Sequence, residues 1–368
     1  MTVRLFCVCQ LIPGRRFEIL NAMTAPSIHP PLRWGILSTA RIIRKNWPAM
    51  LESGAATLVA LASRDIDKAQ GFIDGMQSLS PWPVKPVAHG SYEFLLADPA
   101  IDAVYIPLPT GIRKEWVVRA AQAGKHVLCE KPCAVSSGEL REMLACCEQN
   151  GVRFMDGVRF MHDPRFARLR EILDRGETVG EIKRISSAFS FLGGEDFASG
   201  DIRAQASLEP TGCLGDLGWY CIRAFLWAMA WELPRRVSGR VLGTSDGSAI
   251  NDFSGEMDFA SGATAAFHCS FLAPGQMWLN LSGTRGSVRM ADFISPSPES
   301  DTDWEVNHQR VARPADSGMS SAARMFVRFA GGDGPWPEIS LKTQLVQDAC
   351  ELSSRLGRAV VLDGETYR

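Results

Sequence analysis

The chain has 368 residues, of which 46% are hydrophobic and 22% charged, and its net charge is −2. These values are typical of a soluble globular protein with a full hydrophobic core, and the length favours two domains. The balanced charge excludes the basic footprint of a nucleic-acid or membrane partner, and no apolar run approaches the roughly 20 residues that span a bilayer.

The first 30 residues predict an extension ahead of the first domain. They hold one short apolar patch without the cleavage site of a signal peptide. Met23 opens a natural start, so the protein begins at either Met1 or Met23, and the pair Pro30-Pro31 marks the entrance of the folded region.

Strand-like and helix-like segments alternate from Leu32 onwards. Short apolar strands and helices of 3.6-residue period in strict alternation predict a doubly wound, parallel α/β sheet. The expected strands cover 33–39, 56–64, 102–109 and 126–132, and the expected helices include 111–125 and 137–151.

The pattern changes after about residue 180. Apolar residues alternate on both sides of the turn at 260–262, which predicts an antiparallel hairpin over 252–271. The segment 279–290 repeats this pattern around Gly283 and Gly286, and 341–357 predicts a closing helix. The second domain is therefore expected to be α+β, with a mostly antiparallel sheet.

Ten cysteines invite a disulfide or metal interpretation, but their spacing fits no zinc pattern. In a chain of this size they predict buried, reduced thiols, no metal and a cytoplasmic location. The close pairs are Cys7 and Cys9, Cys129 and Cys133, and Cys146 and Cys147.

The first strand runs into a helix, as in a site for a dinucleotide pyrophosphate. The G-x-G-x-x-G pattern is degenerate here: Gly35 takes the first glycine position, and Ser38 and Ala40 are small enough for close approach. Ser38 or Thr39 adds a hydroxyl donor, and Arg41 follows in the same turn. The alternative is a strand–helix turn without a ligand.

The second strand ends at Ser63 and Arg64, where an NAD site usually places an acid for the ribose hydroxyl. Asp65 stands one or two residues after the position where that acid is expected. A guanidinium binds a 2′-phosphate bidentately, so Arg64 favours NADP over NAD. Otherwise Arg64 is a solvated turn residue.

Two groups are candidates for catalysis. Glu130 and Lys131 end a parallel strand, where open α/β sheets bind ligands, and burial is expected to lower the pKa of Lys131 into a useful range. Asp216 and Tyr220 stand four apart on a helix that begins near Gly215. Together these groups could bind a polyol and relay its proton. The alternatives are a surface lysine, an acid favoured by the helix dipole and a buried structural tyrosine.

The chain from Leu32 to Gly357 resembles the Gfo/Idh/MocA oxidoreductases, in the branch of glucose–fructose oxidoreductase and the dihydrodiol and xylose dehydrogenases. The resemblance implies a Rossmann domain over 31–153 and an open-faced sheet domain over 154–368 that forms a homodimer or homotetramer. It is carried by the motifs WGILSTARI, LASRD, IPLPTGIRKEW, AGKHVLCEKP, VGEIKRISSAFSF, GCLGDLGWYCIR and LSGTRGSVRM.

Lys131 matches the family's catalytic and cofactor-binding lysine, Asp216 its carboxylate, and Tyr220 its proposed acid/base. Pro109, Thr110 and Glu130 match positions that help to seat the cofactor. The sequence departs from the family at four positions: Thr110 replaces an asparagine, Arg113 a histidine, Asp156 a glutamate and Met161 an arginine.

The resulting expectation is an NAD(P)-dependent oxidoreductase that moves a hydride between nicotinamide and a sugar, cyclic polyol or related secondary alcohol. Two alternatives stay open. One is a non-catalytic, dinucleotide-sensing regulatory protein of the same fold, which the altered segment 109–113 would favour. The other is a glycosidase that uses tightly held NAD.

Overall fold

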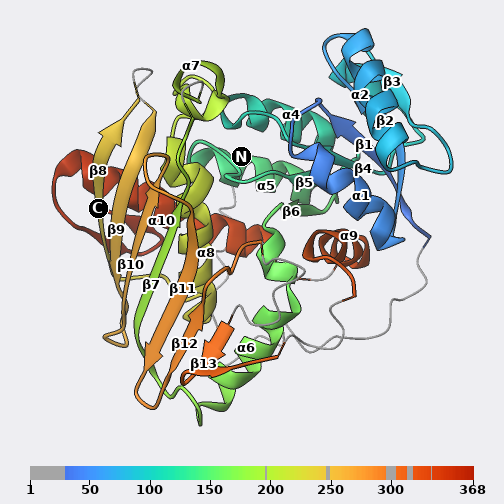
Figure 1. Ribbon diagram of the computed structural model, residues 1–368. Helices are drawn as coiled ribbons and strands as arrows, with labels where there is room; N and C mark the ends of the chain where they lie inside the picture. The colour runs from blue at the N-terminus through green and yellow to red at the C-terminus, as the bar shows by residue number, and fades with distance from the viewer. Residues whose placement is uncertain (1–29, 195–196, 246–248, 296–303, 313–317, 333) are drawn as a thin grey trace, which may run out of the picture.

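The computed structural model describes residues 30–194, 197–245, 249–295, 304–312, 318–332 and 334–368. The extension predicted over 1–30, with Cys7 and Cys9, therefore lies almost wholly outside the described residues. Figure 1 shows two sheets side by side, with helices between them and around the first. No helix in the described ranges is long and apolar enough to cross a membrane.

The first sheet has six parallel strands in the order β3-β2-β1-β4-β5-β6, which confirms the doubly wound class. The sequence did not predict β3, which has three residues, or the short helix α3. The domain division after residue 153 stays a prediction, and β6 lies just beyond it in this same sheet. The strands are β1 (Leu32–Leu37), β2 (Ala56–Ala62), β3 (Val87–His89), β4 (Ala103–Ile106), β5 (His126–Cys129) and β6 (Phe154–Asp156).

Helices cover both faces of this sheet (Figure 1). Asp65, Ser91 and Ser136 each cap the start of the following helix with a side-chain oxygen, which satisfies an amide that the helix leaves free. The helices are α1 (Ile43–Ser53), α2 (Ile66–Leu79), α3 (Tyr92–Ala97), α4 (Thr110–Gln122) and α5 (Ser137–Gln149).

The second sheet has ten strands in the order β14-β13-β12-β11-β7-β10-β9-β8-β15-β16. Both predicted hairpins are confirmed: β9 pairs antiparallel with β10, and β11 with β12. Of the strand pairs that the structure describes in this second sheet, only β7 and β10 run parallel. The strands are β7 (Ile182–Ser190), β8 (Arg236–Thr244), β9 (Ile250–Asp258), β10 (Thr264–Ser270), β11 (Gln276–Gly283), β12 (Ser287–Met290), β13 (Trp304–Val306), β14 (Gln309–Arg310), β15 (Val360–Asp363) and β16 (Thr366–Tyr367).

Helices α8 (Trp219–Ala228) and α10 (Trp336–Leu356) pack on the inner face of the second sheet, and α10 also contacts β6 and α5 of the first unit. The sequence did not predict α9 (Ser321–Gly331), which returns to α1 and places Phe326 and Phe329 against Trp34 of β1. The remaining helices are η1 (Arg159–His162), α6 (Pro164–Arg175), α7 (Phe197–Gly200), η2 (Ile202–Ala204) and the π-helical η3 (Leu214–Gly218).

A fully buried ion pair joins the two units. Arg223 of α8 donates to both carboxylate oxygens of Asp156 at 3.2 and 2.5 Å, and Trp219 donates to the same carboxylate. Arg223 also donates to Thr343 of α10. Asp156 at the end of β6 thus holds α8, which carries Tyr220, against the first sheet.

Removal of Asp156 is expected to destabilise the protein strongly. Asp156→Ala leaves the buried guanidinium of Arg223 without its counter-charge, so the free energy of unfolding should fall by about 3–5 kcal/mol in urea unfolding. The double variant Asp156→Leu/Arg223→Met removes both charges and should recover much of the loss. A loss of under about 1 kcal/mol for the single variant, as for a surface pair, would contradict this role.

Candidate active site

The turn between β1 and α1 begins after Gly35. Gly35 lies inside β1, paired with Ala60 and Val104, and a Cβ there would meet Leu95 of α3 at 2.6 Å. Gly35 thus lies inside the predicted strand, where it allows close packing between β1 and α3, and its role in cofactor binding stays a prediction. The turn is made by Ser38, whose φ of 111° lies in the region that favours glycine.

The turn leaves backbone amides available for an anion. Ser38 Oγ accepts from the amide of Ala40 at 3.2 Å, and the amide of Ser38 donates to Ala62. Among the described residues, the amides of Thr39, Arg41 and Ile42 have no hydrogen-bond acceptor. Free amides between a strand end and a helix start fit the pyrophosphate of a dinucleotide, so the residues present suit the cofactor.

The end of β2 matches the predicted preference for NADP. Asp65, the acid nearest to the strand end, is the N-cap of α2 and accepts from the amides of Asp67 and Lys68. Ser63 is buried, whereas Arg64 is exposed and has no hydrogen bond or ion pair within the described ranges. Arg64 is therefore the group that is free to bind a ribose phosphate.

A cavity of about 680 Å³ runs from the start of α1 to α8. Its walls bring together Ala40 and Arg41 of the turn, Glu130 and Lys131 after β5, and Asp216 and Tyr220. The other predicted cofactor residues, Gly35, Ser38, Thr39, Ser63, Arg64, Pro109 and Thr110, do not line this cavity.

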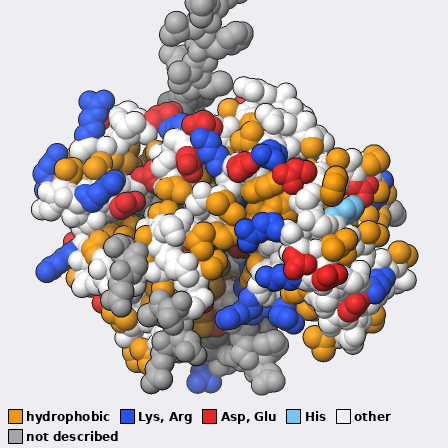
Figure 2. All heavy atoms as spheres, turned by 90° about the horizontal axis from the view of Figure 1, so that it is seen from above, with side chains coloured by type: hydrophobic (Ala, Val, Ile, Leu, Met, Phe, Trp, Pro, Cys, Tyr) orange, Lys and Arg blue, Asp and Glu red, His pale blue; other side chains and the backbone are white. Residues whose placement is uncertain are grey.

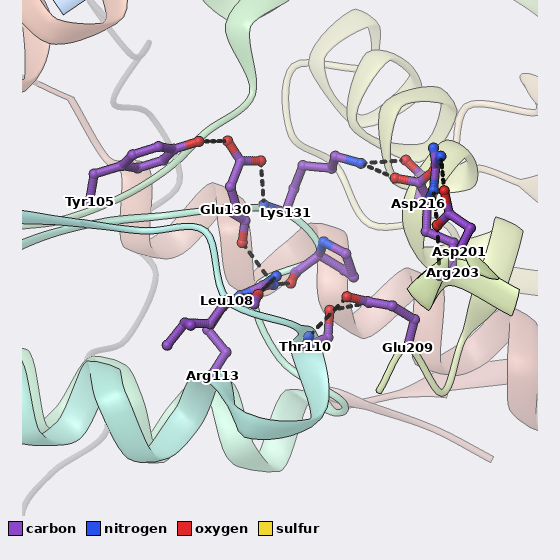
Figure 3. Close-up of polar contacts among 11 residues, drawn as sticks. Tyr105, Leu108, Thr110, Arg113, Glu130, Lys131, Asp201, Arg203, Glu209 and Asp216 are labelled. Atoms are coloured by element: carbon purple, nitrogen blue, oxygen red, sulfur yellow. Dashed lines mark hydrogen bonds and ion pairs between the residues drawn. The ribbon is translucent and has the colours of Figure 1, made fainter. Parts of the chain in front are cut away.

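Lys131, Asp216 and Tyr220 line one end of the cavity, and Figure 3 shows Lys131 pointing at Asp216. Lys131 Nζ donates to Asp216 Oδ1 at 2.5 Å and to the Asp216 carbonyl at 2.8 Å, and it lies 5.0 Å from the centre of the Tyr220 ring. The side chains of Lys131 and Asp216 are 11% and 19% exposed, so a substrate can reach them. The Tyr220 hydroxyl has no hydrogen-bond partner among the described residues, and Asp216 contacts Lys131 rather than Tyr220.

The helix that carries Asp216 and Tyr220 approaches the lysine unusually closely. Asp216 lies in the π-helical η3, which runs directly into α8, and π-turns are frequent at functional sites. A Cβ on Gly215 would lie 2.1 Å from Thr211 Oγ1 and 3.0 Å from Pro132 Cγ. Glycine at 215 thus lets the helix pack on Pro132, which follows Lys131 through a cis peptide bond.

The surrounding charges determine the protonation states of Lys131 and Tyr220. Burial acts most strongly and would lower the pKa of Lys131, but Asp216, together with Tyr220 and Glu130, outweighs burial and raises that pKa. The prediction of a lowered lysine pKa is therefore wrong, and Lys131 stays cationic. Burial raises the pKa of Tyr220, although the nearby Lys131 and Arg159 charges act in the opposite direction. Tyr220 is thus a protonated phenol beside a permanent cation.

Two buried networks hold the ends of β4 and β5. Tyr105 donates to Glu130 at 2.5 Å and accepts from Asn46 at 2.7 Å, which fixes the carboxylate beside Lys131. Arg113 of α4 is 3% exposed and donates to the carbonyl oxygens of Leu108, Glu130 and Pro132 (Figure 3). Arg113 therefore ties the two strand ends together around Lys131.

Thr110, which replaces the family's asparagine, is engaged by a carboxylate. Its amide and hydroxyl donate to Glu209 at 3.1 and 2.5 Å, and Glu209 lines the cavity. Thr110 also begins α4, so the carboxylate sits favourably at a helix N-terminus. The Thr110 hydroxyl is thereby bound within the protein rather than offered to a cofactor.

Arg203 is a site residue that the sequence did not reveal. It donates to both oxygens of Asp201, contacts Asp216 at 3.4 Å and lies over the rings of Phe191 and Phe197. Lys131 and Arg203 together lower the pKa of Asp216 against the effect of burial. In the sequence, Arg203 stands two residues after Asp201, its ion-pair partner. No periodicity or motif connects Arg203 with Asp216.

Family models match both parts of the chain. Residues 32–158 match the oxidoreductase family with an NAD-binding Rossmann fold, and residues 166–289 match the GFO/IDH/MocA C-terminal domain. The chain belongs to the Gfo/Idh/MocA oxidoreductase family. It is therefore a Rossmann-fold oxidoreductase, as the motifs around Lys131 and Tyr220 predict.

Two relatives with a named activity and one solved structure align with most of this chain. A D-xylose 1-dehydrogenase (NADP(+)) of Haloferax volcanii is 31% identical over 90% of this chain and 100% of its own length. The trans-1,2-dihydrobenzene-1,2-diol dehydrogenase of Mus musculus is 30% identical over 77% of this chain and 80% of its own. A 3-ketoreductase of Actinomadura kijaniata, solved with NADP and TDP-benzene, superposes with a TM-score of 0.77 at 26% identity, covering 88% of this chain and 98% of that one.

Proposed function

We propose that this oxidoreductase interconverts a secondary alcohol and its carbonyl on a sugar, cyclic polyol or related compound, with NADP(H) preferred over NAD(H). The observation that carries the proposal is Lys131 between Asp216 and the ring of Tyr220, at one end of the cavity that starts at the amide-rich turn. Relatives named as a sugar dehydrogenase and a diol dehydrogenase support this substrate class.

Each side chain has a distinct task. The nicotinamide ring, when bound, supplies or accepts the hydride. Tyr220 gives its phenol proton to the substrate oxygen during carbonyl reduction and takes it back during alcohol oxidation. The Lys131 ammonium stabilises negative charge on that oxygen, and Asp216 holds the ammonium in place.

Replacement of Arg64 is expected to change the choice of cofactor. Arg64→Ala removes the free guanidinium at the end of β2, so the Kd for NADPH should rise by about 10–100-fold, the range for a charge-assisted hydrogen bond. The Kd for NADH should change by less than about 2-fold. Lys85→Ala, which breaks an exposed ion pair with Asp74, is the matched control. Equal weakening of both cofactors would show that Arg64 does not bind the 2′-phosphate.

A substrate screen tests the proposed reaction. Purified protein is assayed with NADP and NAD against aldoses, inositols, cyclic diols and keto-sugars, following nicotinamide absorbance in both directions. Turnover with at least one class that depends on Tyr220 supports the proposal. Cofactor binding without turnover in either direction would favour the dinucleotide-sensing alternative, and hydrolysis of an aryl glycoside without a net change of absorbance would favour the glycosidase.

We further propose a cytoplasmic homodimer or homotetramer that forms through the outer face of the second sheet. That face presents the half-buried Trp278 beside the hydrogen bond between His268 Nε2 and Asp252 Oδ1 at 2.7 Å. Trp278 and His268 both lie opposite Ala188 in the register, which places them on the same side of the sheet. The free thiols of the eight described cysteines support the reducing compartment.

A further inference from the structure

Arg159 is a cation of the cavity wall that has no ion pair with any described residue. Arg159 opens η1, three residues after β6 ends at Asp156, and its half-buried side chain lines the cavity wall. Among the described residues, it has neither a carboxylate nor a carbonyl partner. On the face that Figure 2 shows, by contrast, basic and acidic side chains lie intermixed.

The other charges near Lys131 are paired or bound by the backbone. Lys131 and Arg203 share Asp216, and Arg113 is bound by backbone carbonyls. Every lining carboxylate accepts hydrogen bonds from other residues, and none of them forms a hydrogen bond or ion pair with Arg159 within the described ranges. These carboxylates are Glu130, Asp201, Glu209 and Asp216.

Arg159 lies on the reaction side of the cavity rather than at the cofactor phosphates. The exposed cations Arg41 and Lys45 stand at the start of α1, beside the phosphate turn that follows β1. Arg159 follows β6, which is separated from β1 by β4 and β5, and the adjacent Phe160 packs against Tyr220 with ring centres 6.1 Å apart. Its charge is felt at Tyr220, whose pKa it acts to lower.

Aromatic side chains pack directly beside Arg159. The adjacent Phe160 packs against Tyr220 and Phe293, with ring centres 6.1 and 5.4 Å away, and Ile294 and Met277 line the same cavity. A guanidinium in such surroundings binds a planar carboxylate bidentately and gains more from it than in water. The cavity offers Arg41 and Lys45 at the start of α1 to the cofactor phosphates, which leaves Arg159 for the substrate.

We propose that the substrate carries a carboxylate, which Arg159 binds while the reacting hydroxyl lies at Tyr220 and Lys131. The substrate class is thus a sugar acid or a carboxylated polyol rather than a neutral sugar. The inference rests on the proposed function, since it assigns a further group to the same substrate. It makes Arg159 a specificity-determining residue that takes no part in the proton transfer.

Equilibrium binding tests this assignment without turnover. Protein saturated with NADP is titrated with the pairs D-glucuronate and D-glucose, and D-galacturonate and D-galactose, followed by tryptophan fluorescence. In at least one pair the acid should bind about 10-fold or more tightly than the neutral sugar, as expected for a charge-assisted hydrogen bond. Arg159→Gln should reduce that ratio to within about 2-fold, and Arg159→Lys should keep part of it because the charge remains.

Arg240→Gln serves as the control, because it removes an exposed arginine on β8 and should leave the ratio unchanged. Acids that bind no better than the neutral sugars in both pairs, or a preference that survives in Arg159→Gln, would overturn the assignment. This titration measures only the affinity for the carboxylate. Failure of the proposed reaction would instead appear in the substrate screen, as absent NADP binding or absent turnover.

Discussion

Tyr220→Phe is expected to lower turnover by about 10²-fold or more while the Kd for NADPH stays within about 2-fold of the wild-type value. The substitution removes only the phenol oxygen, which has no partner among the described residues and faces the cavity. The ring remains packed against Phe160 and Phe189, so α8 keeps its place. Steady-state kinetics and a separate cofactor titration measure the two quantities.

The matched control is Tyr367→Phe, which removes another phenol oxygen, bonded to the carbonyl of Pro234 and away from the cavity. It should leave turnover unchanged. The pH profile adds a second check. Because burial raises the pKa of Tyr220, wild-type alcohol oxidation should rise with pH throughout the range below about 10, and carbonyl reduction should stay flat there. Unchanged turnover in Tyr220→Phe would remove the phenol from the mechanism.

Lys131→Met is expected to lower turnover by about 10²–10³-fold, the range seen when a donor to a developing oxyanion is lost. The ammonium bonds Asp216 and lies over the Tyr220 ring, where its charge acts to lower the tyrosine pKa. Without this charge the pKa of Tyr220 should rise further. The rising limb of alcohol oxidation should therefore move to higher pH, which a purely structural defect would not cause.

Lys114→Met is the control for this variant, since Lys114 forms only a surface ion pair with Glu142 on the neighbouring helix. Its kinetics should match the wild type. Asp216 keeps its contact with Arg203 in Lys131→Met, so the fold should survive, and circular dichroism would verify this. A pH profile that stays in place despite lost turnover would show that Lys131 does not act on Tyr220.

The sequence predicts the parts of this fold that depend on local patterns. The alternation of strands and helices from Leu32, the hairpin turns at 260–262 and near Gly283, and the closing helix all follow from periodicity and turn residues. The meeting of Lys131 with Asp216, 85 residues apart, came from the resemblance to a known family rather than from any local signal.

Other features depend on contacts that no local pattern encodes. Ser38 adopts a backbone conformation typical of glycine, which no glycine pattern in the sequence could reveal. The sign of the Lys131 pKa shift depends on how closely Asp216 approaches, and Gly215 sets that approach. Arg203 and Glu209 join the site only because α7, η2 and the segment after them fold over the cavity.

The most direct measurement is a titration of the purified protein with NADPH and, separately, with NADH, followed by tryptophan and nicotinamide fluorescence. Protein first shown to be free of cofactor retained from expression should bind NADPH saturably, and about 10-fold or more tightly than NADH, because the turn at Ser38 offers free amides and Arg64 is unpaired. Binding of neither cofactor at about millimolar concentration would contradict the account of this site as that of a working oxidoreductase.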